Sequence, residues 1–174
     1  MRIFLALSFF LLSFLLFAQS WKIEKDYEIA FSGKKAEGSL RGLSGLIIFH
    51  PDSFESAIFD VAVEVNTIET GNTTKNKHAM AKSWFFVDQF PKIHFKSRKL
   101  EKTSKGYVVR GELRMRGVKR EVQMPFTFSS DEVVGVFEGS LSVNRKDFGI
   151  MGNFMEFLVG EEFKVLIKVP VTRG

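Results

Sequence analysis

The stretch NTIETGNTTKNKHAMAKSWFFVDQFPKIHF, residues 66–95, decides the fold. It is the longest segment after residue 20 whose pattern does not predict a strand, and on both sides of it apolar and polar residues alternate. Inside it lie a Gly-Asn-Thr-Thr sequence, a charged run that holds His78, and the aromatic run Trp84-Phe85-Phe86. A series of strands interrupted once by such an insert predicts a β-container with one lid or plug.

The clearest predicted strand comes just before the insert, at residues 57–65. Phe59, Val61 and Val63 fall on one face of it, while Asp60 and Glu64 fall on the other, as the two-residue period of a strand requires. Seven further segments alternate in the same way: 27–31, 39–49, 93–98, 107–116, 118–128, 137–144 and 163–171. Glycines at 38, 42 and 45 predict bulges or bends in the second of these strands.

Eight strands with one apolar and one polar face predict an all-β antiparallel domain, because no helical segments alternate with them. A sandwich and a closed barrel both fit the pattern. Strands of about ten residues favour the barrel, which also removes exposed edges. The chain has 20 phenylalanines, many on the predicted inward face. An eight-stranded barrel can be filled by such side chains or can hold one small ligand, and composition leaves both alternatives open.

The first 20 residues predict a secretory signal peptide, with Arg2 before an apolar run and Ala18-Gln19-Ser20 at its end. A retained membrane anchor is the alternative, but the run is short for a span of about 20 residues. Residues 21–174 would then form one exported domain. The chain has no cysteine, so disulfides and thiolate metal sites are excluded, and export without disulfides favours a bacterial periplasmic or secreted protein.

The net charge is +5, and basic residues cluster between residues 92 and 120. We interpret this cluster as a solvated strand face in preference to a surface that attracts anionic lipid. No nucleic-acid motif accompanies it, so a nucleic-acid partner is not predicted. The sequence leaves transient contact with a membrane surface and a homodimer open.

Catalytic and metal-binding patterns are missing from the sequence. His50, His78 and His94 have no partners at metal-ligand spacing. The Gly42-Leu43-Ser44-Gly45 sequence resembles a nucleophile elbow, but Leu46 stands where the second glycine is needed. Glu161 and Glu162 are neighbours on a strand start and face apart. The sequence therefore predicts no enzyme, no metal and no cofactor.

The insert itself predicts a short helix followed by an aromatic loop. Residues 72–82 contain no proline or glycine, and Asn72 or Thr73 could cap a helix there. The three consecutive aromatics at 84–86 are more than one helix face can bury. At least one of them should therefore cover the barrel mouth.

Several motifs in order resemble the YceI-like family over about the whole of residues 21–174. They are Trp21-Lys22-Ile23, Thr67-Ile68-Glu69-Thr70-Gly71-Asn72, Lys75-Asn76-Lys77-His78, Trp84-Phe85, Phe90-Pro91-Lys92-Ile93-His94-Phe95, Gly111-Glu112-Leu113 with Arg116-Gly117-Val118, Arg145-Lys146-Asp147-Phe148-Gly149-Ile150, and Val159-Gly160-Glu161-Glu162-Phe163. The resemblance implies an extended, lipocalin-like eight-stranded antiparallel β-barrel with one short helical insert. It also implies an exported bacterial protein whose apolar interior holds an isoprenoid or another long-chain lipid.

From this reading we predict a noncatalytic binder of a polyisoprenoid or related amphiphilic lipid. The predicted ligand-binding residues are Phe31, Phe59, Val61, Val63, His78, Trp84, Phe85, Phe95, Tyr107, Leu113, Phe126, Phe137, Leu141 and Phe163. His78, Lys75 and Arg145 could meet a polar or anionic head group or could be structural, and Arg145 with Asp147 is expected to fix the turn before Phe148. Two alternatives are a lipid-modifying enzyme that uses the cavity as its active site, and a structural or interaction protein with a packed barrel and no cavity.

Overall fold

The computed structural model describes residues 20–131, 133–152 and 159–174, so the predicted signal peptide lies outside the described residues except for Ser20. The described strands are β1 (Ser20–Ile23), β2 (Glu28–Ser32), β3 (Glu37–Ile48), β4 (Ile58–Glu69), β5 (Lys92–Thr103), β6 (Gly106–Met115), β7 (Val118–Ser130), β8 (Val134–Asn144) and β9 (Glu162–Arg173). The helices are α1 (Thr73–Met80) and the short 3₁₀ segments η1 (Phe54–Ser56) and η2 (Arg145–Phe148).

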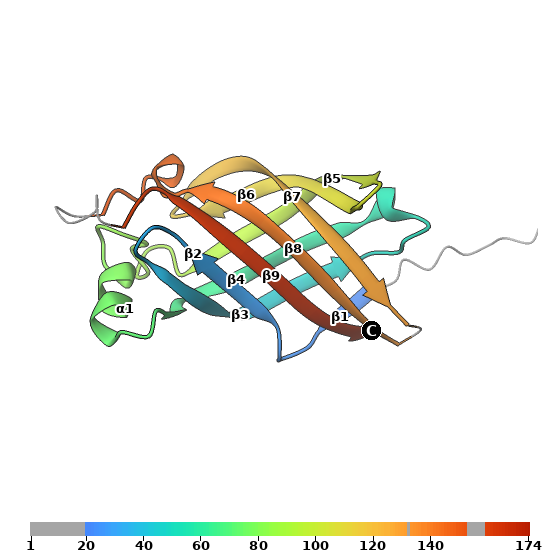
Figure 1. Ribbon diagram of the computed structural model, residues 1–174, viewed down its shortest axis with the longest axis horizontal. Helices are drawn as coiled ribbons and strands as arrows, with labels where there is room; N and C mark the ends of the chain where they lie inside the picture. Colours follow the sequence, from blue (N-terminus) through green and yellow to red (C-terminus); the bar gives the residue numbers. More distant parts are fainter. Residues whose placement is uncertain (1–19, 132, 153–158) are drawn as a thin grey trace, which may run out of the picture.

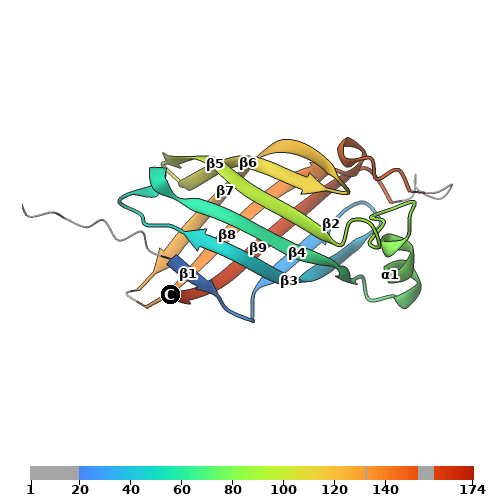
Figure 2. The same ribbon diagram turned by 180° about the vertical axis from the view of Figure 1, so that it is seen from behind.

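These strands pair antiparallel into a closed, elongated barrel (Figures 1 and 2). Neighbours in sequence pair from β3 to β9, and β9 returns to β1 and β2, which in turn pair with β3. Every described strand therefore has a partner on each side along at least part of its length, so none of them is a free edge strand. At about 3.3 Å per residue, a strand of twelve residues runs for about 40 Å. The predicted all-β antiparallel barrel is confirmed.

Two of the described strands share one position in the barrel, which reconciles nine strand segments with eight strand positions. Trp21 of β1 pairs with Ile47 of β3 and with Arg173 of β9. Phe31 of β2 also lies between these two strands, opposite Gly38 and Val165. Residues 24–27 separate β1 from β2. The sequence predicted a strand for β2, at residues 27–31, but none for β1. The prediction of eight barrel strands is confirmed.

The glycines of β3 bend it, as predicted. Its pairing with β4 shifts register twice, between Ser39 and Arg41 and again between Arg41 and Ser44. Gly42 and Gly45 have φ angles of 71° and 130°, a region that residues with a Cβ atom rarely adopt. The bends allow the sheet to curve into a closed barrel.

The insert between β4 and β5 forms the predicted helix α1. The Asn72 side chain accepts a hydrogen bond from the Lys75 amide at 3.0 Å, so Asn72 is the residue that caps it. Figure 1 places α1 at one end of the barrel and the carboxyl terminus at the other. We call these the α1 end and the far end. Among the described residues, no helix has the length and apolar character needed to cross a membrane.

Alternate connections of an antiparallel barrel gather at the same end. The α1 end carries the β2–β3, β4–β5, β6–β7 and β8–β9 connections, and the far end carries β3–β4, β5–β6 and β7–β8. Figure 2 shows α1 beside the β2–β3 turn at the α1 end. Residues that are distant in sequence therefore meet at the mouth of one end.

The basic cluster between residues 92 and 120 lies on the outer surface of the barrel. Lys92 pairs with Glu64 at 2.9 Å and Lys96 with Asp60 at 2.8 Å across β4 and β5. Glu112 accepts from Lys119 of the next strand. These exposed pairs each contribute little, about 0–1 kcal/mol. The geometry agrees with the solvated strand face that we favoured.

Candidate ligand cavity

A cavity of about 750 Å³ lies inside the barrel and extends to the α1 end. Its wall consists of apolar side chains that point inward from several strands: Phe31, Val61, Val63, Phe95, Leu113, Leu141, Phe163 and Val165. Many of these side chains are only partly buried, because they face the cavity and not one another. A volume of this size falls within the usual range for small-molecule sites, about 300–1,000 Å³. The alternative of a packed barrel without a cavity is therefore wrong.

All of the predicted ligand-binding residues except Tyr107 line this cavity. The strands β2, β4, β5, β6, β7, β8 and β9 supply the wall residues, and the insert supplies His78, Trp84 and Phe85. Contact between these side chains and a ligand stays a prediction. Tyr107 lies elsewhere, stacked on Phe126 with ring centroids 5.3 Å apart, on the far-end side of the cavity.

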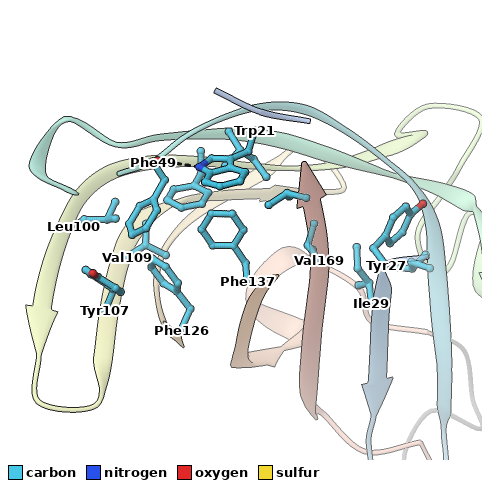
Figure 3. Close-up of a cluster of buried hydrophobic side chains, with 14 of the residues drawn as sticks. Trp21, Tyr27, Ile29, Phe49, Leu100, Tyr107, Val109, Phe126, Phe137 and Val169 are labelled. Carbon is cyan, nitrogen blue, oxygen red and sulfur yellow. Dashed lines mark hydrogen bonds between the residues drawn. The ribbon is translucent and has the colours of Figure 1, made fainter. Parts of the chain in front are cut away.

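The floor of the cavity is made by Phe59, Phe126 and Phe137, which contact the cavity and also belong to an aromatic cluster beneath it. We call four further rings of that cluster the aromatic plug: Trp21, Phe49, Tyr107 and Phe128. Figure 3 shows Phe49 among the floor and plug rings. Below the floor the interior is filled with side chains.

Phe49 is the centre of the plug and is 0% exposed. Its ring lies 5.0 to 6.2 Å from the rings of Phe59, Tyr107, Phe126, Phe128 and Phe137. Trp21 Nε1 donates a hydrogen bond to the Phe49 carbonyl oxygen at 2.9 Å (Figure 3). Our sequence reasoning did not single out Phe49. The available signal was its position two residues after Ile47, on the same inward face.

The aromatic run of the insert divides between the cavity and the outside. Trp84 and Phe85 line the cavity at the α1 end, as the prediction that at least one aromatic covers the mouth requires. Phe86 has a φ angle of 52°, which is uncommon for a bulky residue. This turn of the backbone directs its ring away to Phe90, 6.0 Å distant in an edge arrangement.

Hydrogen bonds link the insert to two other connections at the mouth. Arg116, in the β6–β7 turn, donates to the carbonyl oxygens of Lys82 and Gly149. The Gly152 amide donates to the Ser83 carbonyl oxygen at 2.9 Å. The insert is therefore held against the β6–β7 turn and the β8–β9 connection, and the mouth has a defined shape.

Arg145 lines the cavity and is only 4% exposed. Its Nε donates to the Gly160 carbonyl at 2.8 Å, and its Nη1 donates to the carbonyls of Ile150 and Met151. Its guanidinium also lies over the Trp84 ring, 5.2 Å from the centroid. Arg145 thus fixes the turn around η2 and supports Trp84, the structural role expected from the sequence.

A lysine rim, consisting of Lys34, Lys35 and Lys75, lies on the side of the mouth formed by the β2–β3 turn and α1, and His78 of α1 also lines the mouth there. All four are exposed. No described carboxylate lies within ion-pair distance of the three lysines. Glu37 is the one carboxylate among the described lining residues. The sequence reasoning missed the β2–β3 turn, although counting strands from the insert would have placed it at the same end.

The described polar residues of the cavity lie at its α1 end, and the wall and floor are hydrocarbon. His50 and His94 lie outside the lining set, and the described residues contain no group of three His, Asp or Glu that could hold a metal ion. This arrangement can dissolve an apolar chain and meet a polar group at the mouth. The fold and cavity define an antiparallel barrel of the binding type.

Comparison with known proteins agrees with this class. The YceI-like domain matches residues 21–171, and the chain belongs to the YceI-like family. A UPF0312 protein of Yersinia enterocolitica is 26% identical over 147 residues, covering 76% of this chain and 77% of that protein.

Solved structures share the fold. Burkholderia cenocepacia BcnA superposes with a TM-score of 0.79 at 20% identity, covering 86% of this chain and 99% of that chain. A polyisoprenoid binding domain from Saccharophagus degradans, implicated in plant cell wall breakdown, has a TM-score of 0.67 at 14% identity, covering 90% and 99%. At these identities the likeness is one of fold.

Proposed function

We propose that this protein is an exported, noncatalytic binding protein that holds a polyisoprenoid, or a related long-chain amphiphilic lipid, inside its barrel. Its role would be to carry, store or sequester that lipid. The observation that carries the proposal is the apolar cavity of about 750 Å³, with its described polar lining residues confined to the mouth. A hydrocarbon tail would lie along the wall, and the head of the lipid would lie near α1.

The energetics of burial support a lipid tail as the ligand. Each buried methylene contributes about 0.8 kcal/mol, so a tail of about 20 carbons gains about 16 kcal/mol before the costs of association. Those costs are about 4–15 kcal/mol. A long tail could therefore bind without any polar contact, and the wall residues Phe31, Phe95 and Phe163 would provide the apolar surface.

The arrangement of titratable groups favours binding over catalysis. Acid–base catalysis needs a positioned group within hydrogen-bond reach of the reacting atoms. The described titratable lining residues are Lys34, Lys35, Glu37, Lys75, His78 and Arg145, all at the mouth, and Arg145 is engaged by backbone carbonyls. An enzyme that modifies the lipid tail would need such groups along the wall, where the described residues are apolar.

The ligand class is supported by the resemblance in fold to the Saccharophagus degradans domain, which is described as polyisoprenoid binding. Export is supported by the signal-peptide pattern of the first 20 residues. Loading a lipid in an exported compartment would involve transient contact with a membrane surface.

Native mass spectrometry of gently purified protein tests the proposal. We expect a long-chain lipid to accompany the wild type and to be recovered unchanged after extraction. Leu141→Trp should abolish the bound lipid, because Leu141 faces the cavity. Leu166→Trp is the matched control, since Leu166 is exposed on the outer surface, and it should keep the lipid. A wild-type protein that carries no lipid and takes up no added isoprenoid would contradict the proposal.

A further inference from the structure

The hydrogen-bonded wall of the barrel has a long interruption between β7 and β8. β7 begins at Val118, but among the described residues it pairs with β8 only from Phe126 onward, where Phe126 lies opposite Gly139. Residues 118–125 of β7 therefore pair with β6 alone, and residues 140–144 of β8 pair with β9 alone. We call this unpaired stretch between β7 and β8, on the α1 side of Phe126, the seam.

The backbone of β7 directs half of its polar groups toward the seam. The β6–β7 hairpin closes with a two-residue turn, so Met115 and Val118 form its first hydrogen-bonded pair. Hydrogen-bonded and non-hydrogen-bonded pairs alternate along an antiparallel ladder. The N–H and C=O groups of Lys119, Glu121 and Gln123 therefore point toward β8, where no described backbone group bonds to them. All three residues are exposed, so these groups are solvated.

Pro125 explains why the ladder stops where it does. Its carbonyl oxygen lies 3.1 Å from the position that a Cβ atom of Gly139 would take, so the two strands are still adjacent there. Proline has no N–H, so the next pair after Phe126 and Gly139 would lack one of its two hydrogen bonds. Beyond this point Ser140 and Ser142 of β8 face the seam in the same alternation, without a described backbone partner on that side.

Side chains close the seam on its inner side. The segment η2 follows β8 directly and lies against β7. Its residue Phe148 is 2% exposed, and Ile150 just after it is 1% exposed. Both belong to a buried cluster with Val143 of β8, and Val118 and Val122 of β7 pack against that cluster. Phe148 and Ile150 therefore connect the two sides of the seam through apolar contacts.

The cavity reaches the seam from inside. Met124 of β7 lines the cavity, as do Leu141 and Val143 of β8 and Ile150 from the connection that follows η2. Separation of the two strands would thus connect the side of the cavity with the surroundings, at a place distinct from the mouth. It would break no described β7–β8 ladder bond on the α1 side of Phe126.

We infer that the seam is a lateral gate of the cavity, that Phe148 and Ile150 are its latch, and that a bound chain molecule passes through it sideways. This inference rests on the proposed function and adds a route of entry and exit. A chain that enters only at the mouth must be threaded along the barrel axis, whereas the seam runs beside the cavity and admits many carbons together. Arg116 donates to the Gly149 carbonyl oxygen, between the two latch residues, and this bond breaks when the gate opens.

A cross-link over the seam tests the inference, and the absence of cysteine from the chain makes the cross-link specific. The cysteines of Gln123→Cys/Ser142→Cys are joined by a short bis-maleimide linker that contains a reducible disulfide. Both positions are exposed, and an extension of the β7–β8 register places them opposite each other. The matched control is the same linker in Thr127→Cys/Glu138→Cys, an exposed pair inside the existing ladder.

The measurement is the rate at which the protein, after lipid removal, takes up and releases a dansyl-labelled prenyl alcohol of four isoprene units. Dansyl fluorescence rises when the probe leaves water. We expect the linker over the seam to slow uptake and release by about tenfold, as a closed gate does. The Kd should stay the same, because the linker changes the passage and not the bound state. Reduction of the linker should restore both rates, and the control linker should leave them at the wild-type values.

Phe148→Leu tests the latch, because a smaller side chain holds the two strands together less firmly. Uptake and release should both accelerate by about tenfold, since the local opening becomes easier. Phe128→Leu is the matched control, because Phe128 belongs to the plug and packs on Phe49, and it should leave the rates unchanged.

Spin labels on the two cysteine pairs supply a readout that needs no ligand. Electron–electron double resonance should give a broader distribution of distances over the seam than within the ladder, and Phe148→Leu should broaden the seam distribution further. Equally narrow distributions in both pairs would overturn the gate.

The outcomes of the uptake experiment separate this inference from the proposed function. Rates that the linker over the seam leaves unchanged would overturn the inference and leave lipid binding intact, because the probe would then enter through the mouth. Equal slowing by both linkers would also overturn it, since general stiffening of the barrel would be the cause. Failure of every form of the protein to take up the probe would overturn the proposed function and this passage together.

Discussion

Phenylalanine lines both halves of the barrel interior, but the two halves differ in what the rings contact. At the far end Phe49, Phe128 and Phe137 pack against one another, with centroids 4.4 to 5.5 Å apart. At the α1 end Phe31 and Phe163 meet at 6.1 Å and otherwise face the cavity. The same residue type therefore fills one half and leaves the other half open.

The difference comes from what the connections supply. Phe49 follows the last residue of β3 and enters the lumen from the β3–β4 connection. An eight-stranded barrel can be filled by side chains or can hold one small ligand, and at the far end Phe49 packs among the strand rings that fill it. At the α1 end the connections supply Trp84, Phe85 and the lysine rim, which lie around the opening. The cavity therefore stops at the strand residues Phe59, Phe126 and Phe137, and the connection residue Phe49 packs beneath them.

One substitution in each half of the barrel tests this comparison, and it has the largest expected effect on the free energy of unfolding. Phe49→Ala should destabilise the fold by about 3–5 kcal/mol, because it leaves a void among closely packed rings. Phe163→Ala should cost about 1 kcal/mol, since its ring already faces a cavity. Chemical denaturation of both variants measures the difference. Equal losses would mean that the two halves are packed alike.

A second pair compares the two tryptophans. Trp21→Phe removes the donor to the buried carbonyl of Phe49 and should cost about 1–3 kcal/mol. Trp84→Phe replaces the half-buried indole under Arg145 with a smaller ring that holds a cation more weakly, and should cost about 0.5–1 kcal/mol. Thermal unfolding ranks the two variants, and the reverse order would show that the mouth contributes more to stability than the plug.

Arg116→Met tests whether the mouth opens locally. It removes the hydrogen bonds to Lys82 and Gly149, so the insert and the β8–β9 connection should separate more often. We expect exchange of the Gly152 amide to accelerate by about tenfold in hydrogen-exchange measurements. The Arg173 amide, bonded to Val133 at the far end, serves as the internal control. Acceleration at both amides would indicate global destabilisation instead.

The smallest effect concerns the acid dependence of the insert. The Asn76 side chain, followed by the Gly71 amide, holds the pKa of Glu69 below its ordinary value of 4.5. A lowered pKa means that the interaction stabilises the fold above the ordinary pKa and is lost as the pH falls through the lowered one. Asn76→Ala should raise the pKa of Glu69, as an NMR titration of that carboxyl would show. An unchanged titration would exclude Asn76 as the main cause.

Much of the fold could be predicted from the sequence because a two-residue period reports directly on which face of a strand is buried. The inward positions of Phe59, Val61 and Phe95 follow from that period, and the Asn72 cap follows from local hydrogen-bond chemistry. The division of one strand position into β1 and β2 could not be predicted, because it depends on pairing with β3 and β9.

The site was predicted less completely, because depth along the barrel is a tertiary property. Tyr107 alternates as the other inward residues do, yet it lies below the floor, stacked on Phe126. Lys34 and Lys35 belong to a short turn that looks ordinary in sequence, and they matter because the antiparallel order brings this turn to the mouth. Periodicity identifies the inward face, but not the level that a side chain occupies.

The closing position of β9 has a consequence for the folding of the chain. β9 pairs with β8 on one side and with β1 and β2 on the other. It therefore closes the barrel by joining β8 to the first two described strands. Contacts across such sequence separations slow folding. Until β9 is in place, β2 and β8 would present unpaired edges, which are prone to aggregation. The barrel can therefore close only after its last strand is available, and assembly is expected to be a late, cooperative event.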